Sequence, residues 1–129
     1  MADLASVAAC ALFAFVQGNP DQRFVFETCD PQVIEQARTL LTSPEPGGMH
    51  PTGTVVPGTA DYNPAWRYHL DPASISFAEM SIEVCDADMA YVEAHLDEVG
   101  GAFLPASRWC PWNAVLTGEL DPKIGKVRP

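Results

Sequence analysis

Alternating apolar side chains near the N-terminus restrict the fold of this chain more than any other feature. The alternating residues are Val7, Ala9, Ala11, Phe13 and Phe15. A turn-forming run of Gly, Asn, Pro and Asp follows at 18–21, and a second run of β-forming residues covers 23–28. Period-two alternation on either side of a turn predicts a β-hairpin.

The hairpin places two of the four cysteines opposite each other. With the turn at 18–21, Cys10 lies directly across from Cys29. This pair is either a disulfide or two buried thiols, because only some opposed strand positions have a separation that suits a bridge. The other pair, Cys85 and Cys110, would connect the end of a strand to a tryptophan-rich segment. The absence of C-x-x-C spacing and of nearby histidines argues against zinc and favours an oxidising compartment.

The remaining patterns predict an α+β fold. Asp30 followed by Pro31 is typical of a helix N-terminus, and apolar spacing extends this helix over 31–42. A second helix is expected from Asp86, as N-cap, to a stop at Gly100. Further strands are expected at 52–56, 66–70, 75–84 (with a bulge) and 114–120. The simplest arrangement is an antiparallel sheet with two helices packed on one face and the hairpin at the N-terminus.

Composition limits the size of the fold and the class of partner. The chain has 129 residues, 47% hydrophobic and 19% charged, which predicts one globular domain spanning 1–129. Its formal net charge of -10 repels phosphate backbones and anionic lipid headgroups. The apolar stretch at 4–15 is too short to span a bilayer and follows Asp3, where a signal peptide would be positively charged. Nucleic acid and membrane are therefore not expected as partners.

Residues 103–112, F-L-P-A-S-R-W-C-P-W, are the segment best suited to binding. Its prolines stiffen the backbone, and Trp and Arg are enriched at the centres of protein interfaces. We therefore expect a non-catalytic protein-binding module with contacts at Leu104, Arg108, Trp109 and Trp112. Its most specific form is a protease inhibitor that presents Arg108 to a pocket with an acidic floor. The alternative is that the tryptophans close the core and Cys110 anchors the chain, leaving Arg108 in solvent.

Two further functions fit individual residues. A small-ligand or glycan binder would use exposed aromatic rings at Tyr62, Trp66 and Trp112. A hydrolase would use Asp86 and Glu83 with His69 or His95, provided that a carboxylate and a histidine share one cleft. Tyr91 and His95 share a face of the second predicted helix. No nucleophile, phosphate-loop or dinucleotide motif is present, so we expect no enzyme, cofactor, catalytic residue or metal site.

Several runs of the chain resemble one family of small bacterial proteins labelled calmodulin-binding, related to the N-terminal domain of a slime-mould calmodulin-binding protein. The runs are F-V-F-E-T-C-D-P from Phe24, Y-N-P-A-W-R-Y-H-L-D-P from Tyr62, A-Y-V-E-A-H-L-D-E-V-G-G from Ala90 and W-C-P-W from Trp109. The resemblance implies an exported protein, extracellular or periplasmic, with a disulfide between Cys85 and Cys110. It also implies calmodulin binding, which the charge opposes because calmodulin and this chain are both strongly acidic.

Overall fold

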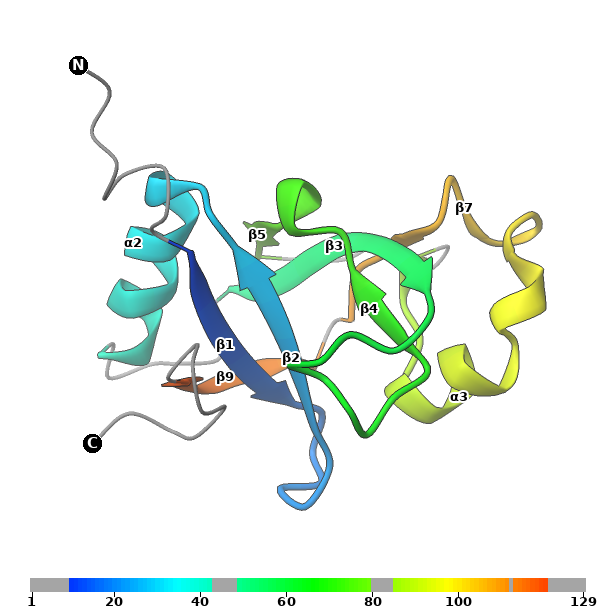
Figure 1. The fold of residues 1–129 in the computed structure, drawn as a ribbon, viewed down its shortest axis with the longest axis horizontal. Coiled ribbons are helices and arrows are strands. Elements are labelled where there is room, and N and C mark those ends of the chain that lie inside the picture. Colours follow the sequence, from blue (N-terminus) through cyan, green and yellow to red (C-terminus); the bar gives the residue numbers. More distant parts are fainter. Residues whose placement is uncertain (1–9, 43–48, 80–84, 112, 121–129) are drawn as a thin grey trace.

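The described residues form two α-helices and two main antiparallel sheets (Figure 1). This computed structural model describes residues 10–42, 49–79, 85–111 and 113–120. The predictions that involve Glu83 and Trp112 lie outside these residues, as does the part of the predicted 75–84 strand beyond residue 79. The α+β class, the antiparallel pairing, the two helices and the N-terminal hairpin predicted from the sequence are confirmed.

The first sheet contains the hairpin and the last strand. Its strands are β1 (Ala11–Val16), β2 (Arg23–Thr28) and β9 (Val115–Leu120), in the order β2-β1-β9. Phe13 pairs with Phe26, which is the register that the predicted turn length requires. The turn uses Gly18 at φ 83°, a left-handed conformation that glycine adopts without steric cost. Because β1 is the central strand, most of its side chains are buried on both faces of the sheet.

The second sheet is organised around one long strand. Its strands are β3 (His50–Pro57), β4 (Tyr68–Leu70), β5 (Ser76–Ala78) and β8 (Arg108–Trp109). Each short strand pairs with a different part of β3: β5 with 50–52, β8 with 53–54 and β4 with 55–57. A 3-10 turn, η2 (Pro72–Ser74), joins β4 to β5. The strands therefore divide between two sheets, whereas the sequence patterns were compatible with one.

The first helix, α2 (Pro31–Leu41), begins and ends close to the predicted positions. The carboxylate of Asp30 accepts a hydrogen bond from the backbone N–H of Gln32 at 2.9 Å. Pro31 occupies the first helical position, where the missing N–H leaves no donor unpaired. The buried side chains of α2 pack toward β9 and the hairpin, at one end of the molecule (Figure 1).

The second helix, α3 (Met89–Ala94), is shorter than predicted. The predicted N-cap at Asp86 is wrong, because the carboxylate of Asp88 accepts from the N–H of Tyr91 at 2.7 Å and caps the helix. The predicted helical stop at Gly100 is also wrong. The helix ends at His95, and a 3-10 turn, η4 (Leu96–Glu98), follows. Leu96 and Val99 still pack on the core, so their apolar spacing does not distinguish this turn from a longer helix.

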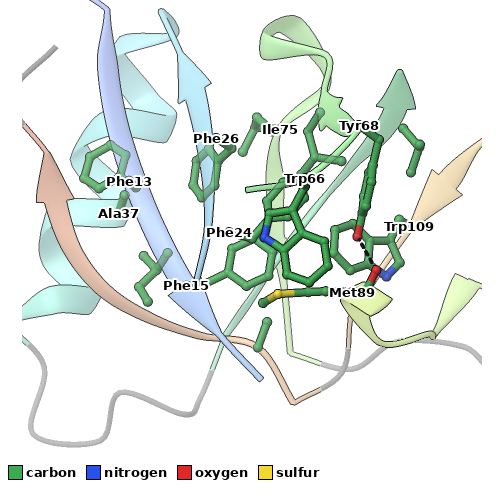
Figure 2. Close-up of a cluster of buried hydrophobic side chains, with 14 of the residues drawn as sticks. Phe13, Phe15, Phe24, Phe26, Ala37, Trp66, Tyr68, Ile75, Met89 and Trp109 are labelled. Atoms are coloured by element: carbon green, nitrogen blue, oxygen red, sulfur yellow. Dashed lines mark hydrogen bonds between the residues drawn. The ribbon is translucent and has the colours of Figure 1, made fainter. Parts of the chain in front are cut away.

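The main core lies between the two sheets and is unusually rich in rings (Figure 2). The hairpin supplies Phe13, Phe15, Phe24 and Phe26, and the rest of the chain supplies Trp66, Tyr68 and Trp109. The ring of Phe24 meets those of Tyr68 at 5.1 Å and Trp109 at 5.2 Å. No helix within the described residues has the length and apolar character needed to cross a bilayer.

Candidate functional site

The tryptophan-rich segment is anchored in the core. Cys110 forms a disulfide with Cys85, and its backbone N–H donates to the Cys85 carbonyl at 2.7 Å. The Trp109 side chain is 0% exposed and donates its indole N–H to the Ala87 carbonyl at 2.8 Å. Leu104 is 1% exposed. In this conformation, burial removes Trp109 and Leu104 from any contact surface, whereas Trp112 lies outside the described residues.

The second pair of cysteines also forms a disulfide, between Cys10 and Cys29 at the open end of the hairpin. Of the two alternatives left open by the sequence, the bridge is therefore the one observed. The Glu27 carboxylate lies with the two sulfur atoms in a group that spans no more than 4.8 Å. Because thiolate is the form of cysteine that binds metal, these bridged sulfurs offer no thiolate ligand.

Arg108 is turned onto the second sheet and is half-buried. Its guanidinium donates to the hydroxyl of Thr52, to the hydroxyl of Ser76 at 3.0 Å and to the carbonyl of Ser74 at 3.3 Å. All three acceptors are neutral. The side chain thereby joins β8 to β3, β5 and η2, which is neither the presented arginine of an inhibitor nor a free solvated one.

The backbone between β7 (Phe103–Pro105) and β8 is held in an uncommon conformation. Leu104, Ala106 and Ser107 have φ angles of 47°, 59° and 63°, in the left-handed region that side chains disfavour. The Ser107 N–H donates to the Leu104 carbonyl at 2.8 Å and closes the turn. The Ser107 carbonyl accepts from the Val55 N–H at 2.8 Å. Pro105 and Ala106 are exposed at the tip, and such clustered strain is typical of functional segments.

An exposed group of rings lies beside this turn. Tyr91 is 50% exposed, and its ring stacks on that of His95 with centroids 4.0 Å apart. Phe103 meets Tyr91 edge-on at 5.2 Å and His95 at 6.0 Å. We call Tyr91, His95 and Phe103 the aromatic platform.

Secondary structure brings the platform together. The predicted shared helix face of Tyr91 and His95 is confirmed, and His95 Nδ1 lies 2.8 Å from the Tyr91 carbonyl. Phe103 joins them because β6 (Val99–Gly100) pairs in parallel with β7. Sequence reasoning missed Phe103, since no local signal predicts a parallel pair of strands this short.

A polar cleft of about 360 Å³ lies on another side of α3. Its lining includes Gln17, Asp86, Asp88 and Asn113. The Gln17 amide accepts from the Met89 N–H at 2.8 Å and donates to Asn113 at 3.1 Å. No histidine lines this cleft, and His69 Nδ1 lies instead 2.8 Å from the Gly58 carbonyl. The hydrolase hypothesis, which needs a histidine beside Asp86 or Glu83, gains no support here.

The aromatic residues proposed for a small ligand are largely packed. Trp66 is 7% exposed and donates its indole N–H to the Arg23 carbonyl at 2.9 Å. Tyr62 packs on the outer face of the first sheet. Burial, together with the carboxylates of Glu27 and Asp71, raises the pKa of Tyr62 to about 12. Burial likewise raises the pKa of Tyr68, whose hydroxyl donates to the Met89 carbonyl at 2.9 Å (Figure 2).

Comparison with known proteins adds one finding. The family model for the N-terminal domain of a calmodulin-binding protein matches residues 9–123, which is most of the chain. No curated protein and no solved structure matches.

Proposed function

Because this chain belongs to the family defined by the N-terminal domain of that calmodulin-binding protein, we propose that it is a non-catalytic protein-binding module that contacts its partner through the α3–β7 end. The carrying observation is Tyr91, a large hydrophobic side chain that stays 50% exposed while other large rings nearby are packed inward. Exposed aromatic side chains in fixed positions supply much of the binding energy of protein interfaces.

Preorganisation supports the same surface. The Cys85–Cys110 disulfide, the buried Trp109 and the three hydrogen bonds of Arg108 all fix the segment that carries the exposed tip at Pro105 and Ala106. A partner that binds such a segment does not have to order it, which lowers the entropic cost of association. The residues predicted as contacts would thus act from behind the surface, as its support.

Site-specific photo-crosslinking tests this proposal. A benzophenone side chain at position 106 should form a covalent adduct with a partner from the native extract or medium. The matched control carries the same group at Asp21, an exposed residue in the hairpin turn. Replacing Tyr91 with Ala should abolish the adduct at 106 without lowering the melting temperature. An equal yield of adducts at 106 and 21 would contradict the proposal.

The narrower hypothesis of a protease inhibitor makes a separate demand on Arg108. Its guanidinium would have to leave three acceptors on the second sheet before it could enter an acidic pocket. The strained turn beside it is the feature that supports this hypothesis. Inhibition of trypsin-like and subtilisin-like proteases, with Arg108→Ala as the control, tests it. An absence of inhibition at micromolar protein rejects it.

Calmodulin is the partner that the family resemblance suggests, and electrostatics oppose it. Both proteins are acidic, so like charges would approach as the complex forms. Calorimetric titration with calcium-loaded calmodulin is a direct test, and we expect no heat of binding at physiological salt. We also propose that the protein works in an oxidising compartment outside the cytoplasm, which the two disulfides support.

A further inference from the structure

The charge around the aromatic platform has one sign. Residues 85–107 contain no lysine or arginine. They contain five carboxylate residues, Asp86, Asp88, Glu93, Asp97 and Glu98. Glu93 is occupied, because it accepts from the Arg67 N–H at 2.6 Å and lies 3.8 Å from the Arg67 guanidinium. Asp88, Asp97 and Glu98 are exposed.

These carboxylates lie in line with the rings. Asp88, Tyr91, His95 and Glu98 follow one another at spacings of three, four and three residues, which places them along one side of the α3–η4 segment. The Glu98 N–H donates to the His95 carbonyl at 2.9 Å, so Glu98 begins the turn after the imidazole. A carboxylate thus lies at each end of the stacked pair of rings.

We infer that the aromatic platform binds an arginine- or lysine-bearing segment of the partner protein, an inference that rests on the proposed function. A cation over an aromatic face is attracted by the ring quadrupole, and a planar guanidinium can also stack on it. The flanking carboxylates accept the remaining N–H donors of the cation. The formal net charge of -10 would speed the approach of a basic partner and repel an acidic one.

The ring contribution is tested with defined peptides and the folded protein. The probe is a ten-residue peptide of alternating arginine and glycine, and the control peptide replaces arginine with glutamate. In NMR spectra of the labelled protein, the arginine peptide should shift resonances of α3, η4 and β7, and the glutamate peptide should shift none. Tyr91→Leu keeps an apolar helix-forming side chain and should weaken binding about fivefold. Tyr91→Trp restores a π face and should bind at least as tightly as tyrosine.

The carboxylate contribution needs a control for net charge, because any acidic protein attracts a basic peptide. One variant combines Asp97→Asn with Glu98→Gln, beside the platform. The matched variant combines Asp21→Asn with Glu35→Gln, which are exposed residues of the hairpin turn and α2. The first variant should weaken peptide binding several-fold more than the second. Equal losses, or peptide shifts spread over the whole surface, would overturn the inference.

The two proposals fail in different ways. If position 106 captures a partner but the arginine peptide does not shift the platform, the contact surface stands and its cationic ligand is rejected. If position 106 captures no more than position 21, the proposed function itself fails. Intact folding of each variant is checked first by its melting temperature and by the dispersion of its amide spectrum.

Discussion

The side-chain amide of Asn63 accepts a hydrogen bond from the backbone N–H of Val25 at 2.9 Å, on the outer edge of β2. The same amide donates to the Tyr68 carbonyl on β4 at 3.1 Å. One buried side chain, 2% exposed, therefore joins the two sheets where no backbone ladder connects these strands. It also occupies an N–H of an edge strand that could otherwise pair with another chain.

Asn63→Ala should destabilise the fold strongly. The substitution leaves the Val25 N–H and the Tyr68 carbonyl buried without this partner, which costs about 2–4 kcal/mol in the free energy of unfolding. Urea denaturation followed by tryptophan fluorescence measures the change. The control is Asn19→Ala in the exposed hairpin turn, which removes an Asn side-chain bond to the Asp21 N–H and should cost about 1 kcal/mol or less. Similar losses in the two variants would contradict the role assigned to Asn63.

The two disulfides should contribute unequally to stability. They close loops of similar length, with sequence separations of 19 and 25, so the restriction of the unfolded chain is worth about 3 kcal/mol for each. Cys85 and Cys110 are also buried, so their replacement with Ala loses packing around Trp109 as well. The double Ala variant of this pair should therefore be the less stable of the two in urea denaturation. A larger loss from the Cys10–Cys29 pair would show that the packing argument is wrong.

Substitutions at Ala106 should reveal the cost of the left-handed turn. Its φ of 59° is accessible to glycine without steric conflict and is unfavourable for a β-branched side chain. Ala106→Gly should leave stability unchanged or raise it by about 0.5 kcal/mol, since relief of strain is offset by the entropy of glycine. Ala106→Val should cost about 1–2 kcal/mol. Equal stability of the Gly and Val variants would indicate that the turn is not held in this conformation.

The tyrosines should make stability fall in alkaline solution. Burial raises the pKa of Tyr62 to about 12 and also raises that of Tyr68, whereas tyrosine in an unfolded chain ionises near pH 10. The unfolded state therefore loses protons first, and stability present below pH 10 is lost as the pH rises toward 12. Urea denaturation between pH 9 and 12 should show this loss, and Tyr62→Phe should reduce its slope. An absorbance titration at 295 nm that shows all tyrosines ionising together near pH 10 in the native state would contradict it.

Local signals predicted the elements that depend on neighbouring residues. The turn at 18–21 sets which residues of the hairpin face each other, so the contact between Cys10 and Cys29 followed from counting along two strands. Asp30 and Pro31 predicted the start of α2, because a capping carboxylate and a proline act within one turn of the helix. The boundary of α3 was missed because both Asp86 and Asp88 satisfy the same local rule.

Direction of side chains was beyond these signals. The sequence identified 103–112 as a stiff segment that combines Arg and Trp, and this follows from residue types alone. Whether Arg108 points to solvent depends on Thr52 and Ser76, which reach it through strand pairing 32 or more residues away along the chain. The aromatic platform likewise exists because a parallel pair of strands returns Phe103 to α3. Pairings of this kind are stabilised by the packing of the whole core, so their energy is not written in any local stretch of residues.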